Sequence, residues 1–313
     1  MASYDMEDPL DMPICTACGT QYPTERTNCL ICDDPRQFTP PTGQSFTSLS
    51  NLHSDGYQNI FTPLHIPNDP EAEVVFTSIH TKPKLAIGQR AILIKTPAGN
   101  VLWDCVTLLD DDTVKEINSR GGLKAIVISH PHYYTTHIEW AKAFDCPVYV
   151  ASQDKEWLAR RGSPSQTVFL SDSDIETDIQ GTKVIRLGGH FPGSLVMLYR
   201  NRLLIADTLV TTPSGLGNWD VDAAKAPRDR PPGMNTFVFM WSIPNMIPLP
   251  PDVIVAMWDI LKKYEFESTH GAFLGMDVIG KTTGEMKHRV LESMQIQIRA
   301  SGHTAHPLLA ESV

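Results

Sequence analysis

Strand-like apolar runs alternate with helical runs between residues 90 and 150, and this order limits the chain to an α/β layer. Residues 90–96 and 101–106 are two apolar runs around a turn-forming tetrad, which predicts a β-hairpin. Residues 123–129 predict a buried strand, and residues 146–150 predict another strand after a helical stretch. Strands that alternate with helices in this way pack as a sheet covered by helices. The sequence therefore predicts an α/β fold.

The composition is that of a globular protein. The chain has 313 residues, of which 42% are apolar and 20% charged, and this excludes a disordered tail, a collagen-like chain and a coiled coil. Its formal net charge of −10, without a cluster of Lys or Arg, argues against binding to nucleic acid or to an anionic membrane. No apolar run approaches the roughly 18 residues that a membrane span needs. The acidic N-terminus lacks the basic and apolar regions of a secretory signal, so we expect a cytoplasmic, reducing environment.

The amino-acid composition changes along the chain, and these changes predict five segments. Residues 1–12 predict a flexible acidic lead, and residues 13–40 hold a cluster of cysteines. Residues 41–71 are rich in Ser, Thr, Asn, Pro and Gly, and they predict a linker that wraps the body. Residues 72–300 carry the strands and helices of the main domain, and residues 301–313 predict a frayed tail.

Four cysteines form two C-x-x-C pairs separated by ten residues, and they are Cys15, Cys18, Cys29 and Cys32. Two residues between thiolates let both sulfurs of one turn point at the same ion, and two such turns complete a tetrahedral site. Zinc suits this site because it binds thiolates without redox chemistry, whereas a rubredoxin-like iron centre uses the same ligands. Disulfides, which are rare in the cytosol, and free thiols are the alternatives without a metal. The pairs predict a structural zinc knuckle, similar to a small zinc ribbon, in which four protein ligands leave no open position for a substrate.

Candidate metal ligands stand where predicted strands end. The buried run 123–129 leads directly into His130 and His132, and side chains at positions i and i+2 of an extended chain share one face. Three further candidates follow apolar runs downstream, and they are His190, Asp207 and His270. Ligand sites of α/β proteins gather at the ends of strands, so we expect these side chains to meet around one cation.

With these motifs the chain resembles the metallo-β-lactamase fold superfamily over roughly residues 72–300. That family has an αββα sandwich, an early Asp after a hairpin, an H-x-H-x-D-H motif, and then a His, a bridging Asp and a final His. The corresponding residues of this chain are Asp104, His130, His132, His190, Asp207 and His270. The sequence looks most similar to a branch with an N-terminal cysteine knuckle. The resemblance implies an αββα fold with a metal-dependent active site.

The chain departs from the family pattern at one place. The Asp-His of the family motif would fall on Tyr134 and Thr135, which bind zinc poorly. The second metal site has therefore lost two of its usual ligands. By resemblance the first site keeps His130, His132 and His190, and three imidazoles with an open position are the ligand set of a catalytic zinc.

The remaining polar residues have more than one interpretation. By resemblance, Asp207 would bind the same zinc or bridge to a second metal. His270 would help to hold a weak second metal or hydrogen-bond the substrate. His137 is either a substitute ligand or base, or a surface residue of a helix next to Glu139.

The resemblance implies a metal-dependent hydrolase whose substrate is a small molecule with an ester, lactone, lactam or thioester carbonyl. A catalytic zinc makes hydroxide available at neutral pH, and this hydroxide would attack the carbonyl. Asp207 would orient the water or take its proton. Tyr133 or Tyr134, with Tyr134 preferred, would either donate to the developing oxyanion or serve only in packing. Residues 212–235, rich in Pro, Gly and Asp, are a candidate lid.

Two other functions compete with the hydrolase. In the first, the chain is a non-catalytic binding protein of the same fold, in which only the structural site of four cysteines holds zinc. In the second, the cysteine cluster is an iron centre that carries electrons. Metal analysis distinguishes these alternatives.

Overall fold

The computed structural model describes residues 8–67 and 69–313 of the chain. Residues 1–7 of the predicted flexible lead lie outside the described residues. The chain divides into two compact units, of which the first ends at Val184 and the second begins at Ile185. The predicted α/β class is confirmed, because each unit contains a β-sheet together with α-helices.

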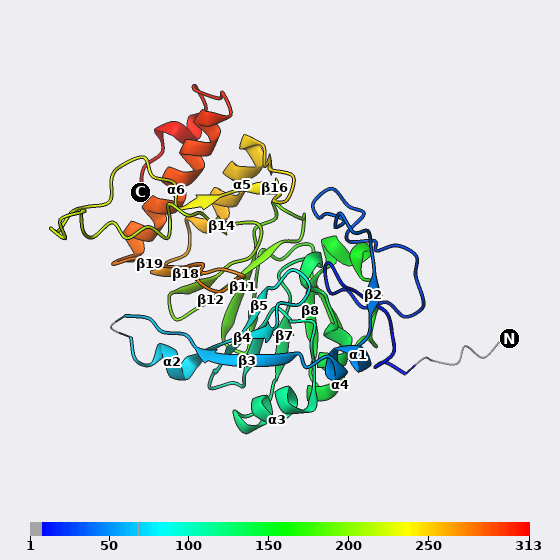
Figure 1. Cartoon of the computed structure of the whole chain (residues 1–313). Coiled ribbons are helices and arrows are strands. Elements are labelled where there is room, and N and C mark those ends of the chain that lie inside the picture. The colour runs from blue at the N-terminus through cyan, green and yellow to red at the C-terminus, as the bar shows by residue number, and fades with distance from the viewer. Residues whose placement is uncertain (1–7, 68) are drawn as a thin grey trace. The chain divides into compact units, whose positions relative to one another are not determined.

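The first unit is built on a seven-stranded sheet with the strand order β3-β4-β5-β6-β7-β8-β9 (Figure 1). From β3 to β6 the neighbouring strands are antiparallel, and from β6 to β9 they are parallel. The β5–β6 pair is the hairpin that the sequence predicts. The strands are β3 (Gln58–Pro63), β4 (Phe76–Lys82), β5 (Arg90–Ile94), β6 (Val101–Trp103), β7 (Ala125–Val127), β8 (Val148–Ala151) and β9 (Thr167–Leu170).

Two helices connect the parallel strands of this sheet. Helix α3 (Asp111–Ser119) joins β6 to β7, and α4 (His137–Phe144) joins β7 to β8 (Figure 1). The side chain of Asp110 caps α3 by accepting a hydrogen bond from Thr113 N at 2.7 Å. Because β6, β7 and β8 follow one another across the sheet, right-handed crossovers place both helices on the same face. The carboxyl ends of β6 and β7 consequently open at one edge, where Asp104 and His130 follow.

The segment predicted as a wrapping linker also contributes to this sheet. Its strand β3 pairs with β4 from Gln58 opposite Lys82 to Pro63 opposite Thr77. The segment also contains α1 (Leu49–Ser54), whose N-terminus is capped by the side chain of Ser48. The shorter elements of the first unit are β1 (Ile14–Cys15), β2 (Phe46–Thr47), α2 (Ala72–Val75), the 3-10 turns η1 (Pro131–Tyr133) and η2 (Ser152–Trp157), and β10 (Glu176–Ile179).

The second unit carries a sheet in which β12, β13, β18 and β19 are neighbours in that order. Strand β13 runs parallel to β18, and the other two pairs are antiparallel. Strand β11 (Thr182–Arg186) leads from the first unit into the second. The other strands are β12 (Leu195–Tyr199), β13 (Arg202–Leu204), β14 (Val210–Thr211), β15 (Phe237–Val238), β16 (Met240–Ser242), β17 (Ile247–Pro248), β18 (Ser268–His270) and β19 (Asp277–Ile279).

Two helices, α5 (Pro251–Leu261) and α6 (Thr283–Ala300), supply the core of the second unit and lie side by side (Figure 1). Their buried side chains pack with those of the sheet in one apolar cluster. Leu308 belongs to the same cluster and is 3% exposed. The tail that the sequence predicts to be frayed thus contains a 3-10 turn, η3 (Pro307–Ala310), whose leucine is buried.

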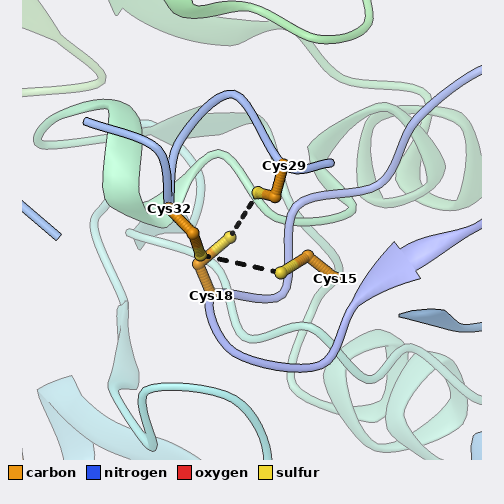
Figure 2. A group of neighbouring side chains, drawn as sticks. All are labelled: Cys15, Cys18, Cys29 and Cys32. Atoms are coloured by element: carbon orange, nitrogen blue, oxygen red, sulfur yellow. Dashed lines mark hydrogen bonds between the residues drawn. The ribbon is translucent and has the colours of Figure 1, made fainter. Parts of the chain in front are cut away.

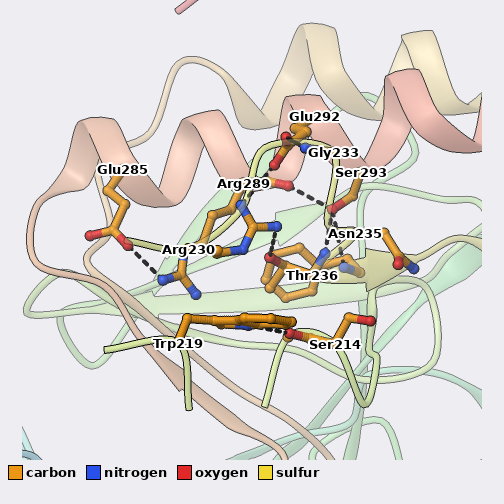
Figure 3. A network of polar contacts seen from close by, with 12 residues as sticks. Ser214, Trp219, Arg230, Gly233, Asn235, Thr236, Glu285, Arg289, Glu292 and Ser293 are labelled. Carbon is orange, nitrogen blue, oxygen red and sulfur yellow. Dashed lines mark hydrogen bonds and ion pairs between the residues drawn. The ribbon is translucent and has the colours of Figure 1, made fainter. Parts of the chain in front are cut away.

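The candidate lid, residues 212–235, is attached to α6 by polar contacts (Figure 3). Arg230 Nη1 donates to Glu292 Oε2 at 2.8 Å, and the backbone N–H of Gly233 donates to the other oxygen of this carboxylate at 2.6 Å. The Trp219 indole donates to the Ser214 carbonyl at 3.0 Å, which holds the ring within the loop. The C-terminal end of the loop is therefore anchored to α6, whereas its tryptophan is held by a bond within the loop.

None of the helices among the described residues is both long and apolar enough to cross a membrane.

Candidate metal centres

The sulfur atoms of Cys15, Cys18, Cys29 and Cys32 come together in the first unit, as the sequence predicts (Figure 2). Cys15 Sγ lies 3.7 Å from Cys32 Sγ, Cys18 Sγ lies 3.5 Å from Cys29 Sγ, and all four sulfurs lie within 4.8 Å of one another. A tetrahedral ion with metal–sulfur bonds of about 2.3 Å places its sulfurs about 3.8 Å apart. A disulfide would need a separation of about 2.0 Å, and all four cysteines are free. The arrangement fits a zinc knuckle and excludes the predicted alternative of two disulfides.

Each cysteine pair is shaped by a tight turn. Gly19 N donates to Cys15 O at 2.8 Å, and Asp33 N donates to Cys29 O at 3.0 Å. Gly19 has a φ of +83°, and a Cβ atom there would overlap Thr107 Oγ1. Only glycine satisfies both the left-handed backbone and the close approach of Thr107.

Hydrogen bonds surround the sulfurs of this cluster. The Tyr22 hydroxyl donates to Cys29 Sγ at 3.2 Å, and it accepts a bond from Leu30 N at 2.8 Å. Hydrogen bonds from Cys15, Cys18 and Cys32 lower the pKa of the Cys29 thiol, whereas burial raises the pKa of Cys18 well above its usual value. Four thiolates require the charge of a metal ion.

Asp104 positions the start of the histidine loop, which we define as residues 130–137. It follows β6 with a φ of +60°, and it is fully buried. Its Oδ1 accepts a hydrogen bond from Ser129 N at 2.7 Å, and its own N–H donates to Val127 O at 2.8 Å. The residue that the resemblance identifies as the early Asp thus holds the backbone next to His130.

The structure brings His130 and His132 together in the first unit. Their ring centroids are 5.0 Å apart, and both side chains are buried. Ser129 Oγ lies 2.9 Å from His130 Nδ1, so the ring's other nitrogen, Nε2, is the one suited to a metal. His132 does not follow a strand as part of an extended segment, as the sequence predicts, but lies in the 3-10 turn η1, which begins at Pro131 directly after His130. The ring of Pro131 fixes the backbone angle at the start of this turn.

The structure brings His190 and Asp207 together in the second unit. His190 follows Gly188 and Gly189, and Asp207 follows β13. His190 Nδ1 donates to the Met240 carbonyl at 3.2 Å, because a carbonyl oxygen only accepts. His190 Nε2 lies 3.9 Å from Asp207 Oδ2, so this ring nitrogen and the carboxylate face each other. An imidazole nitrogen and a carboxylate oxygen are both ligands that a divalent metal accepts.

His270 lies at the end of β18 in the second unit with partners at both ring nitrogens. Its Nδ1 donates to Asp277 Oδ1 at 3.2 Å, and its Nε2 lies 2.8 Å from Ser268 Oγ. Sequence analysis missed Asp277, which faces His270 across the β18–β19 pair. The sequence feature that indicates this contact is the strand after the Gly-rich turn that follows His270, because such a strand can fold back and pair with the strand that ends at His270. A metal role for His270 stays a prediction.

Two residues of the histidine loop lie in environments that sequence analysis did not foresee. The Tyr134 hydroxyl donates to Asp154 O at 3.4 Å, and burial raises its pKa well above the usual value. His137 is 2% exposed, so its interpretation as a surface residue is wrong. Its Nδ1 donates to Tyr134 O at 2.8 Å, and burial lowers its pKa to about 4. Hydropathy alone does not reveal that this polar residue is buried.

The chain is similar to several known proteins. The family model described as the metallo-beta-lactamase superfamily matches residues 87–258. The chain is 38% identical over 264 residues to the uncharacterized protein YmaE of Bacillus subtilis, which covers 83% of this chain and 88% of YmaE. It is 25% identical over 152 residues to the probable metallo-hydrolase MJ0888 of Methanocaldococcus jannaschii, covering 44% of this chain and 70% of that protein. A solved structure of the metallo-beta-lactamase FIM-1 from Pseudomonas aeruginosa in its mono-zinc form has a TM-score of 0.48 and 12% identity, and covers 78% of this chain and 96% of that chain.

Proposed function

The chain belongs to the metallo-beta-lactamase superfamily, and from this premise we propose that it is a metal-dependent hydrolase. We assign the catalytic metal to His130, His132 and His190, with Asp207 as a further ligand. The substrate is a small molecule with an ester, lactone, lactam or thioester carbonyl. The formal net charge of −10 disfavours a nucleic acid as the substrate.

One observation carries this proposal, namely the His190–Asp207 pair. His190 Nδ1 donates to Met240 O, and its Nε2 lies 3.9 Å from the Asp207 carboxylate. His190 is fully buried. A buried imidazole beside a carboxylate is suited to a divalent cation, and a backbone carbonyl on its other nitrogen is the usual support of a metal-binding histidine.

In the proposed reaction the metal and the surrounding residues have separate roles. A bound divalent metal supplies an activated water and polarises the substrate carbonyl. Asp207 orients the water and takes its proton at a carboxylate oxygen. Asp104 holds the backbone at Ser129 and thereby fixes the position of His130. The Tyr134 hydroxyl faces Asp154 O, so we assign this residue to packing of the loop rather than to the oxyanion.

We assign a structural zinc to the cysteine cluster. The sulfur separations of 3.5 and 3.7 Å support a tetrahedral ion, and zinc avoids the redox chemistry of iron. Thiolate sites of this kind persist in a reducing compartment such as the cytoplasm.

Elemental analysis of the protein purified without added metal tests the proposal. We expect about two zinc ions per chain, one for each of the two sites. His190→Ala should lose one of them, whereas the control His65→Ala should lose none because this imidazole is exposed. A panel of esters, lactones, lactams and thioesters then identifies the activity.

Three results would contradict the hydrolase. One zinc per chain that disappears in Cys29→Ser would indicate a binding protein of the same fold with only the cysteine site occupied. A red, iron-containing protein would indicate an electron carrier. Full hydrolytic turnover by a His132→Ala variant would show that this histidine is not part of the catalytic site.

A further inference from the structure

The first cysteine turn continues directly into a segment that contacts the histidine loop. Cys15 N donates to Thr20 O at 3.0 Å, and Ile14 forms an antiparallel bridge with Gln21. Closing the cysteine turn therefore fixes where Gln21 lies. Gln21 is 1% exposed, so it is part of the interior and not of a mobile surface.

The backbone of Gln21 binds the histidine loop at a strained residue. Gln21 N donates to Thr135 O at 3.2 Å. Thr135 has a φ of +40°, which a β-branched residue rarely adopts unless its surroundings hold it there. Thr135 also stands where, by resemblance, the family motif would carry a metal ligand. In this chain a contact from the cysteine knuckle holds that position instead.

The side chain of Gln21 anchors this contact on both sides. Its Nε2 donates to Pro9 O at 2.9 Å, and its Oε1 accepts a hydrogen bond from Arg160. Arg160 Nη1 also forms an ion pair of 2.6 Å with Glu139 of α4, and both side chains are about nine-tenths buried. One glutamine thus connects the knuckle to the helix that follows the histidine loop.

A second contact joins the same two parts of the first unit. Gly19 packs so closely on Thr107 that a Cβ would lie 3.2 Å from Thr107 Cβ. The Thr107 carbonyl accepts a hydrogen bond of 2.8 Å from the hydroxyl of Thr136, the residue next to Thr135. The Thr135–Thr136 step is therefore held by Gln21, which follows the first cysteine turn, and by Thr107, against which that turn packs.

We propose that the metal-bound cysteine knuckle positions the histidine loop, with Gln21 as the positioning residue. The knuckle is then more than a staple of the N-terminal segment, because losing its metal loosens the loop that carries His130 and His132. The effect on the catalytic metal rests on the proposed function, whereas the effect on the loop itself does not. Coupling of this kind is reciprocal, so a metal on the histidines also favours the closed knuckle.

Hydrogen–deuterium exchange of the full-length protein tests this role without relying on activity. The variants are Cys29→Ser, which removes a knuckle ligand, and Gln21→Met, which keeps the ligands and removes the polar anchors. Cys146→Ser is the matched control, because Cys146 is a buried cysteine of the same unit outside the cluster. We expect exchange in residues 130–137 to become about 5- to 150-fold faster in Cys29→Ser, to rise less in Gln21→Met, and to stay unchanged in the control.

Metal binding supplies the second measurement. We expect zinc at the histidine site to bind about 10- to 100-fold more weakly in Gln21→Met, while the cysteine site stays filled. Unchanged loop exchange and unchanged affinity in a protein that holds two metals would overturn the positioning role and leave the hydrolase standing. Faster loop exchange in both variants of a protein whose only metal is at the cysteines would support the positioning role and overturn the hydrolase.

Discussion

Gly19 of the cysteine knuckle provides a quantitative test of how closely the knuckle packs on the rest of the first unit. An L-residue at its φ of +83° lowers the free energy of unfolding by about 1–2 kcal/mol. Alanine makes the unfolded chain less flexible than glycine does, and this offsets about 0.4–1 kcal/mol of that loss. A Cβ would overlap Thr107 Oγ1 and would lie 3.3 Å from Ala86 Cβ. Overpacking of this kind costs about 1–3 kcal/mol. We expect Gly19→Ala to lower the free energy of unfolding by about 2–4 kcal/mol.

The chain offers a control that separates backbone strain from the clash. Gly43 has a φ of +86°, and a Cβ there would meet nothing within 4 Å. Gly43→Ala should therefore cost about 1 kcal/mol or less, from backbone strain alone. Adding Thr107→Ala to Gly19→Ala should recover part of the difference, because it removes the overlapping hydroxyl. The measurement is urea unfolding of the four proteins at one fixed zinc concentration, followed by far-UV circular dichroism.

Two results would refute this reasoning. Equal losses for Gly19→Ala and Gly43→Ala would mean that the knuckle does not press on Thr107. A loss at Gly19 that Thr107→Ala leaves unchanged would mean that the clash lies elsewhere.

Three further predictions concern other parts of the molecule. Tyr134→Phe should leave hydrolysis unchanged and cost at most about 1 kcal/mol, because it removes only the bond to Asp154 O; a large fall in kcat would restore the oxyanion role. The free energy of unfolding should fall as the pH falls from 6.5 through 4, because burial lowers the pKa of His137 to about 4 and only the unfolded chain binds a proton there in this range. The fall in the free energy of unfolding approaches about 3 kcal/mol. His137→Gln should flatten this part of a stability–pH profile. Arg230→Ala should lower the free energy of unfolding by about 2–3 kcal/mol, because it leaves the mostly buried side chain of Glu292 without its ion pair. The same variant should speed proteolysis within residues 212–235, and an unchanged cleavage rate would show that this pair does not anchor the loop.

Features that depend on residues close together in the chain could be predicted from the sequence. The β5–β6 hairpin follows from two apolar runs around a turn, and β7 follows from a buried apolar run. The cysteine cluster could be predicted because two residues between thiols determine a turn whatever surrounds it. The His130–His132 pair follows from a spacing of two residues, although His132 lies in the 3-10 turn η1 and not in the extended segment that the sequence predicts.

Features that depend on distant partners required the tertiary structure. Nothing in residues 41–71 shows that β3 would pair with β4, because an edge strand half exposed to solvent lacks a continuous apolar run. The burial of His137 depends on neighbours from other elements, which its own helix does not specify. Asp277 reaches His270 only because β19 pairs with β18.

The contact between the knuckle and the histidine loop is the clearest example of the difference between what the sequence determines and what only the tertiary structure decides. The sequence alone determined that each cysteine pair would form one turn and that the two histidines would lie close together, because both patterns are set by spacing over a few bonds. Only the tertiary structure decided that Gln21 would lie against Thr135, more than a hundred residues away. A single hydrogen bond between such distant positions leaves no period or spacing in the chain, since it forms only when packing of the whole unit brings the two segments together.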